Sequence, residues 1–325
     1  MSLSRRDALA LLGGLPAITL TTPGWALDYP TRFVRIVIPY LPGGSAEAVA
    51  RMIGQQLHAQ WDQPVIVETK PGAGTTIGAA YIAHSAPDGY TLYIASTSHT
   101  ISQSLYKTLN YDTIKSFAPV SLLARSPFLI VVNGKSDMKS LADLVALAKS
   151  KPGALNFGTS GTGGSTHLAA ELFMMRAGIS AVHIPFNGAP PSLSAVMGDQ
   201  VQFTFADISS IGLVKSGALR CLGVTTLKRS SKLPDVPTFD EQGFKGYEVT
   251  NWSSVIAPAG TPPEIVSFIN ASMKKALETK PVQEIFDKQG FDVAYSTPDE
   301  LKAFMVSEVA KYEEILKHIG LYKTR

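Results

Sequence analysis

Short apolar runs of strand length alternate along this chain with segments whose apolar residues recur at helical spacing. The run Val34 to Ile38 ends at Pro39, and residues 46–57 then place apolar side chains on one face of a helix. Further strands are expected at residues 65–67, 91–95, 128–132, 155–157, 182–184, 201–205 and 219–225. Alternating strands and helices form parallel crossovers and open sheets covered on both faces. Because the chain has 325 residues, we expect two α/β domains of roughly 100–200 residues each.

The first 26 residues are predicted to be an export signal peptide rather than part of the fold. Arg5 and Arg6 precede the apolar stretch Ala8 to Leu20, and Gly24 and Ala26 supply the small residues of a cleavage site after Ala26. The stretch is shorter than the ~20 apolar residues that a membrane-spanning helix needs. The paired arginines favour the twin-arginine route, and the general secretory route stays open. We expect a soluble protein in the periplasm.

Two threonine–proline sequences in the C-terminal part predict helix starts. Thr261-Pro262-Pro263-Glu264 and Thr297-Pro298-Asp299-Glu300 each match a capping box, in which the Thr side chain accepts an amide hydrogen and the Glu reaches back to the cap amide. We expect helices to begin at Pro262 and Pro298. The proline-rich stretch Leu233 to Thr238 is expected to return the chain to its first domain.

Charge and cysteine content exclude several classes of protein. The formal net charge of +3 includes no basic block, which disfavours nucleic-acid binding. The single cysteine, Cys221, excludes an intramolecular disulfide and any multi-cysteine metal or iron–sulfur site. The six histidines show no ligand spacing such as H-x-x-x-H. We therefore expect no metal and no cofactor.

The glycine-rich segments do not match catalytic or nucleotide-binding motifs. In residues 72–78 the third glycine falls one position late for a dinucleotide fingerprint. The Gly158–Thr166 loop lacks both the Gly-Lys of a P-loop and the pattern of a nucleophile elbow. Ser165 and His167 are two residues apart, so they do not face each other on a helix. We expect no enzyme. The alternative is an exported hydrolase or transferase that uses a Ser or Thr of this loop.

Three glycine-rich loops at strand ends run into helices, an arrangement that suits an anion. Residues 42–45, 72–76 and 161–166 would direct unpaired amide hydrogens and the positive ends of helix dipoles outward. In open α/β sheets, ligands bind beyond the carboxyl ends of the strands, where these loops lie. None of the loops carries Lys or Arg, apart from Lys70 at the edge of the second. This favours a small carboxylate over a polyphosphate, although each loop alone is also explained as a tight turn.

Several motifs resemble those of the Bug-type solute-binding proteins, the receptors of tripartite tricarboxylate transporters. These motifs are Pro39-Tyr40-Leu41-Pro42-Gly43-Gly44, Val67-Glu68-Thr69-Lys70-Pro71-Gly72-Ala73-Gly74, Leu155-Asn156-Phe157-Gly158-Thr159-Ser160-Gly161 and Val182-His183-Ile184-Pro185-Phe186-Asn187-Gly188. The resemblance implies a two-lobed periplasmic-binding-protein (Venus flytrap) fold, with a mostly parallel sheet flanked by helices in each lobe. Residues 27–124 and 250–325 would form lobe 1, and residues 125–249 lobe 2. We expect a monomer that delivers a small organic carboxylate to the membrane subunits of such a transporter or to a sensor ectodomain.

The resemblance also implies the residues that would bind the ligand. In the family, backbone amides and waters of the first two loops hold a carboxylate, and lobe 2 contacts the rest of the ligand. The residues carried over in lobe 1 are Tyr40, Pro42, Gly43, Gly44, Ser45, Ala46, Glu47, Gly72, Ala73, Gly74, Thr75 and Thr76. Those in lobe 2 are Ser160, Gly161, Thr162, Gly163, Ser165, Thr166, Phe186, Asn187, Gly188 and Asp207.

Three positions depart from the family pattern. Glu47 stands where the family usually has Asp, Thr69 where it has Asn, and Asn187 where a Lys or Arg is usual nearby. The missing positive charge at Asn187 argues against a ligand with several carboxylates. Tyr40, Phe186 and Trp252 are candidates for an aromatic wall of the site, although such aromatics are more often core residues.

Overall fold

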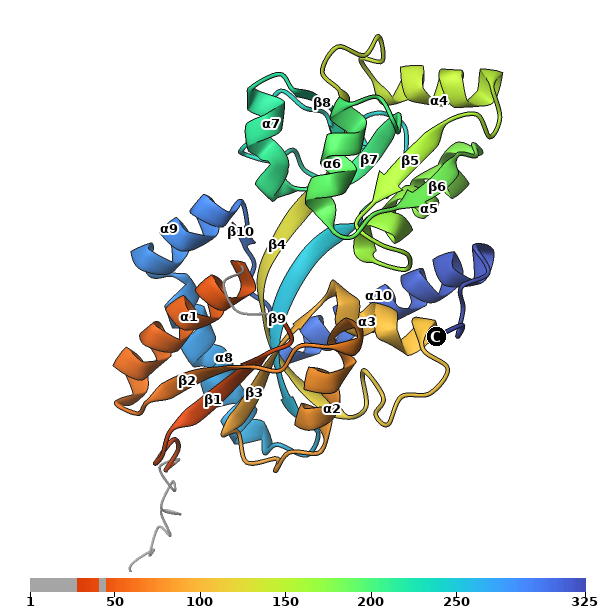
Figure 1. Cartoon of the computed structure of the whole chain (residues 1–325). Helices are drawn as coiled ribbons and strands as arrows, with labels where there is room; N and C mark the ends of the chain where they lie inside the picture. The colour runs from red at the N-terminus through yellow and green to blue at the C-terminus, as the bar shows by residue number, and fades with distance from the viewer. Residues whose placement is uncertain (1–27, 41–44) are drawn as a thin grey trace, which may run out of the picture.

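A computed structural model describes residues 28–40 and 45–325 (Figure 1). The export signal predicted for residues 1–26 lies outside the described residues, as do the predicted site residues Pro42, Gly43 and Gly44. No helix of the described part is long and apolar enough to cross a membrane.

The N-terminal strands build a parallel sheet, as the alternation of strands and helices predicts. β1 (Val34–Ile38) pairs in parallel with β2 (Val65–Thr69) on one side and with β3 (Thr91–Ser96) on the other. The helices and short elements that follow these strands or return from the C-terminal part are α1 (Ser45–Trp61), η1 (Ala73–Thr75), α2 (Thr76–Ala83), α3 (Thr97–Leu105), α8 (Pro263–Leu277), α9 (Lys280–Gln289), β10 (Asp292–Val293) and α10 (Pro298–His318). Apolar side chains of β1, α1 and α8, such as Ile36, Leu57 and Ile269, are fully buried together.

The middle of the chain builds the second lobe in the same way. β5 (Asn156–Thr159) pairs in parallel with β6 (Val182–Pro185) and β7 (Phe203–Asp207). The other elements of this part are α4 (Leu141–Ser150), α5 (Ser165–Ala177), α6 (Ala189–Met197), η2 (Ile208–Ser210), α7 (Ile211–Lys215) and β8 (Leu219–Val224). Its core contains a group of aromatic side chains, among them Phe157, Phe173 and Phe205.

Two long strands connect the lobes. β4 (Phe117–Asn133) pairs antiparallel with β9 (Thr250–Pro258) as far as Pro127, and from Phe128 onward with β7 and β8. Figure 1 shows both strands curving from one lobe into the other. The strand order of the sheet is β2-β1-β3-β9-β4-β7-β5-β6, with β8 and β10 also paired to β4. The predicted two-lobed α/β fold is confirmed, and the lobe boundaries at residues 124/125 and 249/250 stay a prediction.

One of the two predicted capping boxes forms and the other does not. Thr297 Oγ1 accepts from the Glu300 amide at 3.3 Å, and Glu300 Oε2 accepts from the Thr297 amide at 2.8 Å, so α10 begins at Pro298 as predicted. The prediction of a capping box at Thr261 was wrong. The Thr261 hydroxyl instead donates to the Pro258 carbonyl at 2.8 Å, and α8 begins one residue late, at Pro263.

The prediction that Leu233 to Thr238 returns the chain to lobe 1 was also wrong. Val224 donates its amide hydrogen to Pro237 O at 3.1 Å, which ties this stretch to the end of β8. Phe239 follows directly and is fully buried in the second core. The chain returns through β9 instead.

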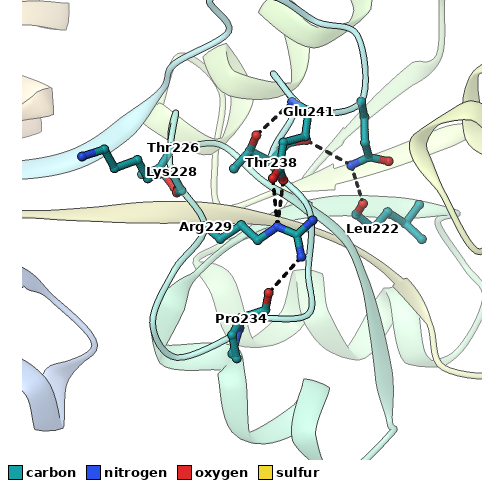
Figure 2. A network of polar contacts seen from close by, with 8 residues as sticks. Leu222, Thr226, Lys228, Arg229, Pro234, Thr238 and Glu241 are labelled. Carbon is teal, nitrogen blue, oxygen red and sulfur yellow. Dashed lines mark hydrogen bonds and ion pairs between the residues drawn. The ribbon is translucent and has the colours of Figure 1, made fainter.

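A polar network fixes this stretch in place (Figure 2). Arg229 Nε donates to both carboxylate oxygens of Glu241, at 3.0 and 2.9 Å, and Arg229 Nη1 donates to Pro234 O at 3.0 Å. Glu241 Oε2 also accepts from the Thr238 amide at 2.7 Å. Hydrogen bonds to Thr238 and Arg229 lower the pKa of the Glu241 carboxyl.

We predict that His99, on α3, makes the protein less stable at mildly acidic pH. Its side chain is fully buried, Nε2 lies 2.8 Å from the Thr113 carbonyl, and Nδ1 has no partner among the described residues. Burial lowers its pKa from 6.5 to about 4. Between pH 6.5 and 4 the unfolded chain binds more protons, so the free energy of unfolding falls as the pH falls, by about 2 kcal/mol between pH 7 and 5.

Urea unfolding of the wild type and of His99→Phe from pH 7.5 to 4.5 measures this effect. His99→Phe is expected to be less stable at pH 7.5 and to lose part of the pH dependence. The part that remains belongs to other groups, including His183, whose pKa burial also lowers to about 4. Exposed His318 is the control, and His318→Gln should keep the wild-type profile. An unchanged slope in His99→Phe would contradict the assignment.

Candidate functional site

Two adjoining hollows lie between the lobes and share Ser98. The first, which we call the Asp207 hollow, has a volume of about 350 Å³. Its lining residues are Tyr40, Ala46, Val49, Ile94, Ser96, Thr97, Ser98, Ser165, Asp207, Asn251, Trp252, Ser253 and Phe291. The second, which we call the Phe186 hollow, has a volume of about 530 Å³. Its lining residues are Gly74, Ser98, Ile101, Ser102, Leu105, Tyr106, Ser160, Gly161, Thr162, Gly163, Gly164, Pro185, Phe186, Asn187 and Arg325. Each hollow takes residues from both lobes.

Helix starts meet at the Asp207 hollow. Ala46 is the second residue of α1, Thr97 is the first residue of α3, and Ser165 is the first residue of α5. No N-cap side chain bonds the first-turn amides of α3 or α5. Free first-turn amides and the positive end of the helix dipole both favour an anion. The three helix starts therefore favour a negatively charged group near them.

Asp207 is the one carboxylate in the described lining of this hollow. It ends β7, is half-buried, and burial raises the pKa of its carboxyl. In the same lining, the Tyr40 hydroxyl hydrogen-bonds with Ser96 Oγ at 2.5 Å. Burial raises the pKa of Tyr40, its hydrogen bonds to Ser96 and Ser98 oppose the shift, and the charge of Asp207 raises it further. Both groups therefore belong to one polar cluster.

The loop of residues 72–75 has an unusual backbone. Gly72, Ala73, Gly74 and Thr75 have φ angles of 126, 44, 60 and 83°, which are four consecutive positive values. The Thr75 amide donates to the Gly72 carbonyl at 3.0 Å, which closes the loop as a turn. Tyr106 Oη donates to the Ala73 carbonyl at 2.9 Å and holds the loop beside α3. Only Gly74 of this loop reaches the lining of the Phe186 hollow.

The second-lobe loop is held by its own side chains. Thr166 is buried, and its Oγ1 lies 2.9 Å from Ser160 Oγ and accepts from the Ser160 amide at 3.2 Å. The Gly163 amide donates to His167 Nδ1 at 3.1 Å. Arg325 Nη2 donates to the Thr162 carbonyl at 2.9 Å. Ser160 to Gly164 all line the Phe186 hollow.

The imidazoles near this loop are engaged elsewhere. His167 accepts from Gly163, its Nε2 lies 3.2 Å from Glu171 Oε1, and its ring stacks on His183 with a centroid separation of 3.9 Å. His183 Nε2 lies 2.6 Å from Thr159 Oγ1, but Thr159 is fully buried and lines neither hollow. In the described residues no imidazole hydrogen-bonds to Ser160 or Ser165. The serine–base pair that the hydrolase alternative needs is thus not formed in this structure.

The structure brings about half of the predicted site residues to the two hollows. Tyr40, Ala46, Ser165 and Asp207 line the Asp207 hollow, and Gly74, Ser160, Gly161, Thr162, Gly163, Phe186 and Asn187 line the Phe186 hollow. The lining does not include Glu47, Gly72, Ala73, Thr75, Thr76, Thr166 and Gly188. Glu47 pairs with Arg51 at 2.5 Å, and Gly188 precedes α6. Ser45 begins α1. That any of these residues binds a ligand stays a prediction.

Sequence reasoning missed several lining residues. Ser96 ends β3, and Thr97 and Ser98 begin α3, at a strand-to-helix junction that carries no glycine to mark it. Asn251 and Ser253 lie on β9, a strand that the apolar pattern did not predict. Arg325 is far along the chain from everything it contacts. Of the candidate aromatic wall, Tyr40 and Trp252 reach one hollow and Phe186 the other. No cluster of His, Cys, Asp or Glu that could hold a metal occurs within residues 28–40 and 45–325.

Comparison with known proteins agrees with the two-lobed architecture. BugT of Bordetella pertussis is 34% identical over 319 residues, which cover 96% of this chain and 97% of that protein. The periplasmic binding protein BugD is similar in structure, with a TM-score of 0.73 and 31% identity over 90% of this chain and 99% of BugD. An R. palustris protein solved with adipate has a TM-score of 0.76 and 32% identity, again over 90% of this chain and 99% of that one.

The match to a protein family covers most of the chain. Residues 49–321 match the family described as the tripartite tricarboxylate transporter family receptor, TctC. This range includes the described parts of both hollows apart from Tyr40, Ala46 and Arg325. The chain therefore belongs to the tripartite tricarboxylate transporter receptor family and is a solute-binding protein of that family.

Proposed function

We propose that this protein captures a small organic carboxylate between its lobes and delivers it to the membrane subunits of a tripartite tricarboxylate transporter or to a sensor ectodomain. The observation that carries the proposal is the meeting of helix starts and the glycine-rich loops of both lobes at two hollows whose described lining contains a single cation, Arg325. A cleft of this kind offers neutral backbone donors to an anion. The related R. palustris protein was solved with adipate, a small carboxylate.

The binding step follows from the connection between the lobes. β4 pairs with β9 in its first half and with β7 from Phe128 onward, so a change of twist where these pairings meet moves one lobe against the other. Closure brings Ser160 to Gly164 of lobe 2 toward Gly74 and α3 of lobe 1. A carboxylate bound between the lobes replaces water at backbone amides of both lobes. Because it then binds the closed form more tightly than the open form, it favours closure. We propose a monomer divided at residues 124/125 and 249/250.

We propose the periplasm as the compartment, with export directed by residues 1–26. The predicted signal combines Arg5 and Arg6 with a cleavage site after Ala26. BugD, which is similar in structure, is a periplasmic binding protein.

Export is predicted to leave a mature chain that begins at Leu27. The full-length precursor, expressed in a Gram-negative host, should appear in the periplasmic fraction with the intact mass of residues 27–325. Replacing both Arg5 and Arg6 with Lys should block its export, because the twin-arginine route requires the pair. Export of the double variant at the wild-type level would show that the general secretory route is used. An uncleaved chain in the membrane fraction would contradict the proposal.

Carboxylate binding without turnover is the central prediction. In a thermal-shift screen against mono-, di- and tricarboxylates, the ligand at ~100 times its Kd should stabilise the mature protein by about 2.7 kcal/mol through mass action. Mass spectrometry should recover the ligand chemically unchanged. Ser160→Ala and Ser165→Ala should weaken binding by tenfold at most, because each removes about one hydrogen bond. Turnover that either variant abolishes would support the hydrolase alternative.

Backbone geometry at Gly74 should matter more than the side chains around it. A Cβ at this residue would lie 2.7 Å from Tyr106 Oη and would have a φ of +60°. Gly74→Ala is therefore expected to cost about 2 kcal/mol, from backbone strain and the loss of the Tyr106–Ala73 hydrogen bond. It should also weaken binding of the ligand found in the screen. In a Tyr106→Phe background the same change should cost only about 1 kcal/mol, which gives a measurable coupling.

Gly153→Ala is the matched control for this experiment. Gly153 has a φ of +72° with no atom within 4 Å of an added Cβ, so it carries the strain without the contact. The Gly153→Ala variant should lose about 1 kcal/mol in its free energy of unfolding and keep the wild-type ligand affinity. Urea unfolding and isothermal titration measure both quantities. Equal losses of affinity in Gly74→Ala and Gly153→Ala would contradict a role for the residue 72–75 loop.

A further inference from the structure

The Asp207 carboxylate faces the cleft without a hydrogen-bond donor among the described residues. Its carboxylate ends β7 and faces the Asp207 hollow, and its backbone carbonyl, not its side chain, accepts from Ser210 Oγ at 2.7 Å. The described residues show no hydrogen bond or ion pair to the carboxylate itself. An ionised carboxylate can only accept hydrogen bonds, and a half-buried one without a donor is costly. Because no described residue donates to Asp207, a donor on a bound ligand can take that place.

No cation in the described lining donates to Asp207. The described residues around the Asp207 hollow include no Lys or Arg. Burial is the cause of the raised pKa of Asp207, which agrees with the lack of a nearby positive charge. The hydroxyls of this lining and the side-chain amide of Asn251 can each donate or accept, so they do not discriminate between ligand groups.

The two hollows differ in charge. Arg325 lines the Phe186 hollow, donates to the Thr162 carbonyl, and forms no ion pair within the described part of the chain. Asp207 lines the other hollow, and Ser98 lies where the two meet. A ligand that extends through both hollows thus meets a positive side chain at one end and a negative one at the other. A second carboxylate beside Asp207 would be repelled in a poorly solvated site.

From this arrangement we infer that the ligand is a carboxylate that also carries a nitrogen donor, an ammonium or an amide N–H, and that this donor binds to Asp207. The inference rests on the proposed function, since it assumes that a carboxylate is captured in the same cleft. It assigns Asp207 as the residue that selects such ligands over di- and tricarboxylates.

The experiment compares ligands that differ only in their distal group. Hexanoate, 6-aminohexanoate, adipamate (the monoamide of adipate) and adipate share one chain length, and butyrate, 4-aminobutyrate, succinamate and succinate form a shorter series. Isothermal titration of the mature protein at pH 7.5 ranks each series. In the series that binds, we expect the ammonium or amide member to bind at least tenfold more tightly than the dicarboxylate.

Asp207→Asn tests the residue. It should reduce the difference between the nitrogen-bearing ligand and the dicarboxylate to threefold or less, because the amide side chain both donates and accepts. Asp235, an exposed carboxylate of the second lobe outside both hollows, is the matched control, and Asp235→Asn should keep the wild-type ranking. The wild-type ranking tests the inference even if Asp207→Asn does not fold.

The outcomes separate this inference from the proposed function. A dicarboxylate that binds as tightly as its nitrogen-bearing partner overturns the inference and leaves carboxylate capture standing. An unchanged ranking in a folded Asp207→Asn variant overturns the role of Asp207. Failure of every member of both series, and of every carboxylate in the thermal-shift screen, counts against the proposed function and the inference together.

Discussion

The antiparallel pairing of β4 with β9 is the constraint on which the rest of the molecule depends. The pair extends from Phe117 opposite Pro258 to Pro127 opposite Thr250, and β4 then continues as a central strand of the second lobe. Both sheets are thereby built on one strand. Two register shifts, near Pro119 and near Leu122, interrupt the regular pairing, and irregularities of this kind increase bending and twist. The lobes are thus joined by a continuous but curved ladder.

A buried threonine fixes the place where the two crossing strands enter lobe 2. Thr225 Oγ1 accepts from the Phe128 amide at 2.8 Å and lies 2.5 Å from the Val249 carbonyl, just before β9 begins. On another side, Leu105 of α3 shares a core with Leu168 of α5 and Ile315 of α10. Separating α3 from α5 would expose this apolar surface, at about 25 cal/mol per Å². Burial of this surface therefore favours the arrangement in which α3 lies against α5.

The sequence pattern predicts the strands inside each lobe well and the crossing strands poorly. Every strand expected from an apolar run overlaps an observed one, but β9, the short β10 and the first half of β4 were missed. β9 begins Thr250-Asn251-Trp252-Ser253-Ser254, a mixed run, because Asn251, Trp252 and Ser253 line the Asp207 hollow. A strand that forms a polar cleft cannot show the continuous apolar run of a buried strand.

The two wrong predictions about chain course have equally local causes. Thr261-Pro262-Pro263-Glu264 offers two prolines for the helix start, and the pattern alone does not say that the Pro258 carbonyl takes the Thr261 hydroxyl. The composition of residues 233–238 indicates a connection, but what keeps it in lobe 2 is the burial of Phe239 among distant aromatic residues. Contacts of this range, like that of Arg325 with Thr162, leave no mark in a short segment of sequence.

In the proposed mode of binding, backbone amides supply most of the hydrogen bonds to the carboxylate, so they contribute little to specificity. Amides at helix starts and in the glycine loops bind a carboxylate whatever the rest of the ligand is, so they give affinity without choosing among carboxylates. Selection among carboxylates then depends on a few side chains of the lining. These are the charged residues Asp207 and Arg325 and the neutral Asn187. A change at one of these positions alters the range of ligands and leaves the loops and the two-strand connection intact. A cleft built in this way can acquire a new specificity by a single substitution, because the groups that hold the carboxylate and the groups that select the ligand are different.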